Sequence, residues 1–371
     1  MGLKIALDCR HFIGDRPCTF KMKCICENYS PMGKRILIIK LGALGDVVRT
    51  LSLLPSLKKV YPKSHISWVS LPNGVRILKG HPLIDQLFAY DSPGITALQA
   101  QEFDLIISLD KEPEPAGLCN ILKAKEKKGI CLSKWGTPQP TDPKVEPYFE
   151  LGLDDDLKFF KNKKTYPELI HEALDVPYRR EPYRLYPDKQ AKEKAQRIFS
   201  SFTQSKRAVV GLNTGAGNVF ACKAPSKEKW VEIAKELLNL GYLVALYGGP
   251  YEKELNQWIN KACDNQLLDT GTDNTEMEFV ALVGLSDVFV TGDTLGLHVA
   301  ISQGVPTVAL FGPTCAQEID LFDNGVKLVT PAECAPCYKR SCQKNPNCMD
   351  IISSREIVQA VVNLLPKSCT V

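Results

Sequence analysis

Residues 35–50 read RILIIKLGALGDVVRT, an apolar run that leads into two glycines and a carboxylate. The run Arg35–Lys40 predicts a strand of a parallel sheet, because strands buried on both faces are almost continuously apolar. Gly42 and Gly45 indicate that another group approaches the backbone closely where the chain leaves this strand. The carboxylate of Asp46 lies at the same strand end. The stretch therefore predicts an α/β fold with a candidate site at the end of its first strand.

Short apolar runs alternate with longer helical patterns along the rest of the chain, which is typical of parallel sheets covered by helices. Further strands are expected at His65–Ser70, Phe103–Leu109, Arg207–Asn213, Tyr242–Tyr247, Asp287–Thr291 and Thr307–Phe311. A charged, proline-containing stretch, residues 178–205, separates two such series. The last helix is expected to begin at Ser353 in a capping box with Glu356. We therefore predict four segments: a cysteine-rich extension (1–32), two Rossmann-like domains (33–185 and 186–352), and a C-terminal helix and tail (353–371).

Length and composition restrict the class of protein. A chain of 371 residues exceeds the size of one hydrophobic core, so two domains are the default expectation. The net charge of +4 is small and dispersed, so nucleic acid is not expected as a partner, whereas an anionic small molecule or lipid headgroup is compatible with it. No window of about 18 apolar residues exists and the N-terminus does not match a signal peptide, so we expect a cytoplasmic protein.

The first strand end matches neither of two common nucleotide-binding motifs. Its two glycines do not form the G-x-G-x-x-G pattern of dinucleotide enzymes, and no Gly-Lys-Ser/Thr of a P-loop follows. The simplest alternative for Asp46 is a helix N-cap, which stabilises a helix by about 1 kcal/mol. Spacing alone favours neither the cap nor a site.

Three stretches in the second half of the chain also leave strands through glycines. Residues 213–217 (NTGAG) offer backbone amides to a phosphate, and Lys223 follows before the next helix. Residues 248–250 (GGP) end the next strand, and residues 291–298 (TGDTLGLH) lead from a third strand into a helix. The last stretch offers a carboxylate, a hydroxyl and amides to a sugar or ribose. Its alternatives are that the aspartate only caps the helix and the histidine only packs.

Together these stretches resemble the family 9 glycosyltransferases, whose best-known members are ADP-heptose:lipopolysaccharide heptosyltransferases. The resemblance rests on KLGALGDVVRTLSLLPSLKKVYP (residues 40–62), LNTGAG (212–217) followed by KEKW, YGGP, TGDTLGLHVAISQGVPTVALFGPT (291–314), and CAPC through CMDII. It covers the chain from about Arg35 to Leu365. It implies a GT-B fold, in which two Rossmann-like, doubly wound domains face a cleft and bind the acceptor and the nucleotide sugar, respectively.

The resemblance also implies roles for individual residues. Asp46 matches the base that deprotonates the acceptor hydroxyl, and Lys223 matches the lysine that neutralises the departing nucleotide. Transfer would invert the anomeric carbon and need no catalytic metal. The residues that match nucleotide-sugar contacts are Asn213, Thr214, Gly215, Gly248, Asp293, Thr294, Leu295, Gly296 and His298. Leu295 stands where the family usually has glycine.

The implied function is an inverting glycosyltransferase that moves a sugar, heptose from ADP-heptose foremost, onto a lipopolysaccharide core or related glycan. Its partners would be a nucleotide-sugar donor and a glycan or glycolipid acceptor, with peripheral contact at the cytoplasmic face of the inner membrane. Leu157–Tyr166, where lysines alternate with aromatic residues, is either a solvated loop or an acceptor or membrane-surface patch. Two alternatives remain open: another nucleotide sugar, and a non-catalytic relative that binds metal or partners.

Eight of the fourteen cysteines form two clusters. We expect the N-terminal tetrad to bind one structural zinc, because the extension has few large apolar side chains and needs another source of folding energy. This tetrad consists of Cys9, Cys18, Cys24 and Cys26. The C-terminal set, Cys334, Cys337, Cys342 and Cys348, holds metal, forms disulfides or stays reduced. Iron–sulfur ligation and unpaired thiols remain open for both clusters.

Overall fold

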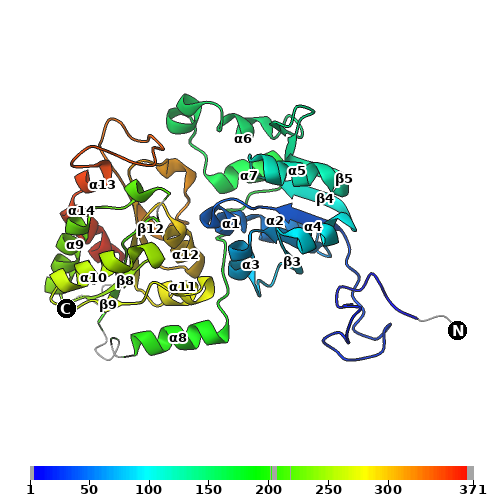
Figure 1. The fold of residues 1–371 in the computed structure, drawn as a ribbon, viewed down its shortest axis with the longest axis horizontal. Helices are drawn as coiled ribbons and strands as arrows, with labels where there is room; N and C mark the ends of the chain where they lie inside the picture. Colours follow the sequence, from blue (N-terminus) through cyan, green and yellow to red (C-terminus); the bar gives the residue numbers. More distant parts are fainter. Residues whose placement is uncertain (1–3, 201, 203–206, 218, 366–371) are drawn as a thin grey trace. The chain divides into compact units, whose positions relative to one another are not determined.

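The computed structural model describes residues 4–200, 202, 207–217 and 219–365, and the chain divides into two compact units. The first unit comprises the chain up to Gly42 together with residues 52–153 and 168–179. The second comprises residues 43–51, 154–167 and the chain from Arg180 onward. Each unit contains one six-stranded sheet (Figure 1). The ends of the predicted extension (1–32) and tail (353–371) lie outside the described residues, and the predicted domain borders stay predictions.

The sheet of the first unit has the strand order β3-β2-β1-β4-β5-β6, in which only β6 is antiparallel to its neighbour. Its strands are β1 (Arg35–Ile39), β2 (His65–Ser70), β3 (Gln86–Ala89), β4 (Glu102–Ser108), β5 (Lys123–Leu132) and β6 (Pro138–Pro140). Its helices are α2 (Leu53–Val60), α3 (Pro72–Leu78), α4 (Ser92–Gln99), α5 (Pro113–Ile121) and α6 (Glu146–Glu150), and most of α7 (Tyr166–Leu174). Leu37 and Ile39 of β1 pack in one core cluster with Leu98 of α4 and Leu118 of α5. The strand order reverses between β1 and β4.

The sheet of the second unit is parallel throughout, in the order β12-β11-β10-β7-β8-β9. Its strands are β7 (Val209–Asn213), β8 (Leu243–Tyr247), β9 (Leu268–Asp269), β10 (Val288–Gly292), β11 (Thr307–Phe311) and β12 (Gly325–Val329). Its helices are α1 (Leu44–Thr50), α8 (Lys189–Phe199), α9 (Lys227–Asn239), α10 (Lys253–Ala262), α11 (Glu276–Val283), α12 (Leu295–Gln303), α13 (Cys348–Ile351) and α14 (Ser354–Leu364). Short helical turns are η1 (Leu157–Lys161), η3 (Ala221–Lys223), η4 (Pro250–Glu252) and η5 (Ala316–Glu318).

Helices cover both faces of the second sheet. On one face Trp230 of α9, Ile259 of α10 and Ile357 of α14 share a buried cluster with Val210 and other strand residues. On the opposite face the ring of Tyr247 packs edge-on against Phe289, with centroids 5.1 Å apart, and its hydroxyl donates to the carbonyl of Leu282 in α11. Large side chains on both sides of each strand explain why the strands read as continuous apolar runs.

The predicted α/β class with two doubly wound sheets is confirmed. The strands β2 and β11 begin and end at the predicted residues, and the other predicted strands differ by one or two residues at their ends. Helix α8 lies inside the charged stretch 178–205 that separates the two predicted series, and Asp188 caps it by accepting from the amide of Ala191. Ser353 is the N-cap of α14 as predicted, but its side chain makes no capping hydrogen bond, so the predicted capping box is wrong.

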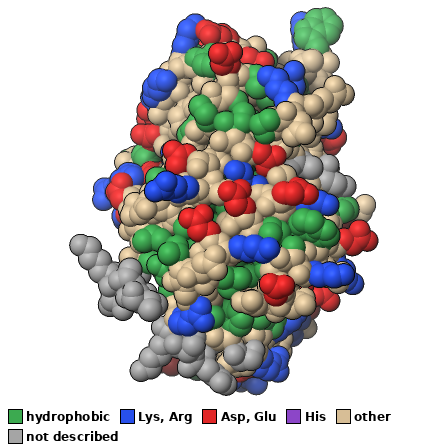
Figure 2. Space-filling model, turned by 90° about the vertical axis from the view of Figure 1, so that its left-hand side faces the viewer, with side chains coloured by type: hydrophobic (Ala, Val, Ile, Leu, Met, Phe, Trp, Pro, Cys, Tyr) green, Lys and Arg blue, Asp and Glu red, His purple; other side chains and the backbone are tan. Residues whose placement is uncertain are grey.

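The described residues include no helix long and apolar enough to cross a membrane. On the face of the molecule drawn in Figure 2, acidic and basic side chains are interspersed rather than gathered by sign. A mixed face of this kind creates no extended field of one sign.

Candidate active site

The two strand ends at the order reversal of the second sheet are joined by hydrogen bonds. In doubly wound sheets, ligands bind beyond the carboxyl ends of the strands at this reversal, which here lies between β7 and β10. Asn213 ends β7, and its side-chain amide donates to the hydroxyls of Thr291 and Thr294 at 3.0 and 3.1 Å. Two motifs that the sequence singled out separately therefore form one group.

Helix α12 begins directly at this group. Thr294 is its N-cap and accepts a hydrogen bond from the amide of Gly296 at 3.1 Å. Asp293 is not the cap, so the capping alternative for this residue is wrong. A Cβ atom at Gly296 would lie 2.9 Å from Nδ2 of the Asn213 side chain. The side chain of Asn213 therefore approaches the backbone too closely for any residue with a Cβ atom at position 296. Gly296, which follows Leu295 at the start of the helix, meets this requirement.

Lys223 and Asp293 form an ion pair beside the same strand ends. The ammonium group of Lys223 lies 3.4 Å from the Asp293 carboxylate and donates to the Asp293 carbonyl at 3.1 Å. Burial alone would raise the pKa of Asp293, but the nearby charges of Lys223 and Arg49 hold it below its usual value. The aspartate is therefore ionised at neutral pH, and it balances the lysine.

A buried carboxylate that the sequence analysis missed, Glu252, holds the glycine loops after β7 and β8. It accepts from the amides of Gly217 and Gly249 at 3.1 and 2.8 Å. A Cβ atom at Gly215 would lie 2.1 Å from its Cγ, and one at Gly248 would lie 2.6 Å from its Cβ. Gly215 and Gly248 therefore leave room for the side chain of Glu252. The amide of Gly217, which the sequence analysis assigned to a phosphate, donates to Glu252 in this structure.

Thr214 lies in the same loop, fully buried, and its hydroxyl donates to the Asn256 side chain at 2.5 Å. Its carbonyl accepts from the indole of Trp230 at 2.9 Å. Both contacts fix the loop to the neighbouring helices α9 and α10, which makes a structural role for this threonine clear.

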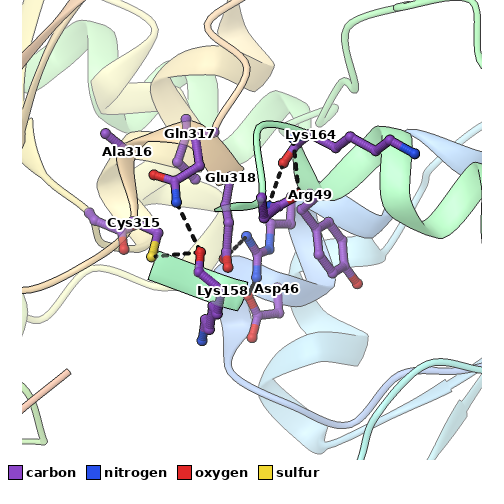
Figure 3. Close-up of polar contacts among 12 residues, drawn as sticks. Asp46, Arg49, Lys158, Lys164, Cys315, Ala316, Gln317 and Glu318 are labelled. Atoms are coloured by element: carbon purple, nitrogen blue, oxygen red, sulfur yellow. Dashed lines mark hydrogen bonds and ion pairs between the residues drawn. The ribbon is translucent and has the colours of Figure 1, made fainter. Parts of the chain in front are cut away.

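Asp46 lies in the first turn of α1, where the N-cap is Ala43 without a side-chain hydrogen bond. The capping alternative for Asp46 is therefore wrong. Its carboxylate oxygen Oδ1 instead lies 2.8 Å from Nη2 of Arg49, one turn along the helix (Figure 3). Arg49 also lies 3.8 Å from Oε2 of Glu318 and 3.8 Å above the ring of Tyr166. The sequence analysis did not predict the three partners of Arg49. Only the pair with Asp46 has a signal in the sequence, because residues three apart are neighbours on a helix.

Gly42 and Gly45 predicted that another group approaches the backbone closely. At Gly45 this group is the ring of His298. His298 is 4% exposed, and a Cβ atom at Gly45 would lie 2.8 Å from its Cδ2. Its Nδ1 is 3.0 Å from the hydroxyl of Tyr183. Burial, followed by the charge of Arg49, lowers the pKa of His298 to about 4, so the ring is neutral at pH 7. Gly45 therefore serves the packing of α1 on α12.

Gly42 serves a different contact, inside the first unit. Asp110, at the end of β4, accepts from the amides of Leu41 and Gly42 at 2.5 and 2.8 Å and pairs with Lys40. This carboxylate lies at the strand-order reversal between β1 and β4. It holds the turn that precedes Asp46 in the chain.

The cysteine clusters line two cavities. The four N-terminal thiols border a cavity of about 100 Å³ together with His11. Cys222 and the four C-terminal cysteines border one of about 650 Å³, and the thiol of Cys222 donates to the carbonyl of Lys339 at 2.9 Å.

No disulfide joins any cysteine between residues 4 and 365. Within the described part of the chain, no three His, Cys, Asp or Glu side chains are arranged to hold a metal ion. The N-terminal zinc site stays a prediction.

The chain is an α/β protein with two Rossmann-like sheets and a candidate ligand site at the strand-order reversal of the second. Residues 95–347, more than half of the chain, match the model of glycosyltransferase family 9 (heptosyltransferase). The chain belongs to this family and is a glycosyltransferase, which confirms the resemblance noted in the sequence.

Relatives with names or solved structures agree with this assignment. The chain is 26% identical to lipooligosaccharide heptosyltransferase 2 of Haemophilus influenzae, over 76% of this chain and 84% of the relative. The crystal structure of a family 9 glycosyltransferase from Veillonella parvula aligns with a TM-score of 0.70 at 20% identity, covering 89% of this chain and 97% of that one. The ADP-heptose lps heptosyltransferase II of E. coli aligns with a TM-score of 0.67 at 19% identity, covering 89% and 98%. The GT-B type of the fold is thereby confirmed.

Proposed function

We propose that the chain transfers heptose from ADP-heptose onto a lipopolysaccharide core or related glycan, with inversion at the anomeric carbon. The observation that carries this proposal is the joining of Asn213, Thr294, Asp293 and Lys223 at the strand-order reversal of a family 9 chain. The names of the relatives support the choice of heptose and of a lipopolysaccharide-type acceptor. The same reaction with another nucleotide sugar is the alternative.

In the proposed reaction Asp46 takes the proton of the acceptor hydroxyl while its oxygen attacks the anomeric carbon. The new carbon–oxygen bond forms on the face opposite the departing ADP, and the bond to the phosphate oxygen breaks with its electron pair. Lys223 then stabilises the negative charge that develops on the diphosphate. The ion pair of Lys223 with Asp293 supports this role, because it keeps a cation at the strand ends before ADP binds. The proposal includes no catalytic metal.

For the acceptor side we propose that residues 157–166 contact the glycolipid or the cytoplasmic face of the inner membrane. The helical turn η1 presents Phe160, which is 57% exposed. The neighbouring ring of Phe159 instead stacks on Tyr338 at 5.4 Å, and Lys158 lies 3.8 Å from the centre of the same ring. One aromatic side chain therefore anchors the segment, and the next is exposed beside several lysines.

Release of nucleotide from a panel of nucleotide sugars, with and without a heptose-free lipopolysaccharide core acceptor, tests the proposal. ADP release from ADP-heptose that depends on the acceptor is the expected result. Asp46→Asn should bind ADP as the parent does and lower turnover by roughly 10² to 10⁴, as is typical of a lost general base. Asp175→Asn, which changes an exposed pair with Lys144, is the matched control. Acceptor-dependent release from another nucleotide sugar alone would replace the donor, and release from none would favour a non-catalytic relative.

A further inference from the structure

The side chain of Arg49 is enclosed by two carboxylates and an aromatic ring. It is 15% exposed, and its two terminal nitrogens face different partners: Nη2 faces Asp46 and Nη1 faces Glu318 (Figure 3). The guanidinium carbon lies 3.8 Å above the centre of the Tyr166 ring. A planar guanidinium can make all three contacts at once, whereas the point charge of a lysine cannot.

The two carboxylates keep the guanidinium of Arg49 charged. Burial alone would lower the pKa of Arg49, but Asp46 and Glu318 raise it above its ordinary value, so the guanidinium stays charged at any working pH. A guanidinium that stays charged can therefore orient the Asp46 carboxylate through a charge-assisted contact of 2.8 Å.

Three segments of the second unit hold this arrangement. Glu318 belongs to η5, where the side chain of Gln317 donates to the carbonyls of Lys158 and Phe159 at 3.0 and 3.2 Å. The hydroxyl of Tyr166 lies 2.9 Å from that of Thr50, which donates to the backbone carbonyl of Asp46 at 2.7 Å. Because α1 has only seven residues, its own hydrogen bonds hold it weakly and these contacts fix its orientation.

We propose that Arg49 is a positioning residue for Asp46, and that Glu318 and Tyr166 hold the guanidinium in the geometry this role requires. The inference rests on the proposed function, because it assigns Arg49 to the same carboxylate. Arg49 fixes one oxygen of Asp46 and so sets the direction from which the acceptor hydroxyl is deprotonated. Glu318 holds the other terminal nitrogen of Arg49, so that the guanidinium cannot turn to pair with Asp46 through both nitrogens.

Arg49→Met, Arg49→Lys and Glu318→Gln test the inference in the full chain, with ADP-heptose and acceptor. We expect Arg49→Met to lower kcat by about 10²-fold, the loss typical of a misplaced reacting group, while the Kd for ADP changes by less than about threefold. The acid limb of kcat/KM against pH should move upward by about 1 to 3 pH units, because a nearby cation favours the charged form of a carboxylate. Arg49→Lys should restore the acid limb but recover only part of kcat, since the charge returns without the fork. Glu318→Gln should lower kcat less than Arg49→Met does.

Arg180→Gln is the matched control, because Arg180 pairs with Asp320 and Asp323 in the same unit and contacts none of the site residues named above. It should leave kcat and the pH profile unchanged. A merely structural role of Arg49 would lower thermal stability without moving the acid limb, and that result, or a kcat within twofold of the parent, overturns the inference. Asp46→Asn in the same series separates the two proposals. If it is as active as the parent, the proposed base is wrong; if it is inactive while Arg49→Met is not impaired, only the role of Arg49 is wrong.

Discussion

Replacing Asp110 by asparagine is expected to destabilise the first unit by about 3 to 5 kcal/mol, the usual cost of removing one partner of a buried ion pair. The side chains of Asp110 and Lys40 are 2% and 5% exposed, so water does not replace the lost charge. The carboxylate also accepts two backbone amides, from Leu41 and Gly42. Both amides donate to the same oxygen, Oδ2, so an asparagine oxygen in that place still accepts from both, and the expected loss lies at the lower end of the range.

The assay is chemical denaturation of the parent and Asp110→Asn at pH 7, followed by far-ultraviolet circular dichroism. Asp175→Asn is the control in the same unit, because its pair with Lys144 spans 2.6 Å but both side chains are about 60% exposed. The control should leave the unfolding midpoint unchanged. A midpoint of Asp110→Asn equal to that of the control would refute the reasoning, because it would show that burial does not strengthen the pair.

Three further predictions follow from other parts of the chain. Because burial and the charge of Arg49 lower the pKa of His298 to about 4, unfolded chains protonate this ring near pH 6.5 while folded chains do not. Keeping His298 neutral in the folded state therefore costs nothing above about pH 6.5. As the pH falls from about 6.5 toward 4, the free energy of unfolding decreases by up to about 3 kcal/mol. His298→Gln should therefore lose stability less steeply over this interval, and parallel denaturation curves would contradict it. Lys223→Ala should weaken ADP binding by roughly 10- to 100-fold in calorimetry, since hydrogen bonds to charged groups contribute about 1.5 to 3 kcal/mol, and should weaken AMP binding less; equal losses would place the lysine away from the diphosphate. Elemental analysis of protein purified without chelator should find zinc that persists when the C-terminal cysteines become serine and disappears in Cys9→Ser or Cys18→Ser, whereas metal-free protein of full stability would end the zinc hypothesis.

Local sequence predicted the strand ends of the site well. The NTGAG and TGDTLGLH stretches can be recognised in the sequence for two reasons. A parallel strand buried on both faces is apolar, and the turn that follows it contains small and polar residues. The close approach at Gly45 could be predicted too, although the approaching group could not. A missing Cβ indicates a neighbour, but the neighbour is His298, from a distant helix.

The partners of Asp46 and of the glycine loops could not be predicted in the same way. Glu318 and Tyr166 reach Arg49 from segments far apart in the chain, and neither carries a local signature. Glu252 follows Gly249 by three residues, but its contact with Gly217 joins two different strand ends. Such pairs depend on which strands become neighbours, which short-range patterns do not specify.

The amino-acid sequence by itself determined that this chain is an α/β protein with two doubly wound sheets, that it resembles family 9 glycosyltransferases, and that Asp46, Lys223 and Asp293 belong to segments that follow strands. These properties depend on periodicity and on short motifs, which are local. Only the tertiary structure decided that Asp46 and Asp293 do not cap their helices, that Lys223 pairs with Asp293, and that Arg49 lies between Asp46 and Glu318. The physical reason is that a charged side chain in a partly buried site takes the partner that folding brings within reach, whatever its distance along the chain.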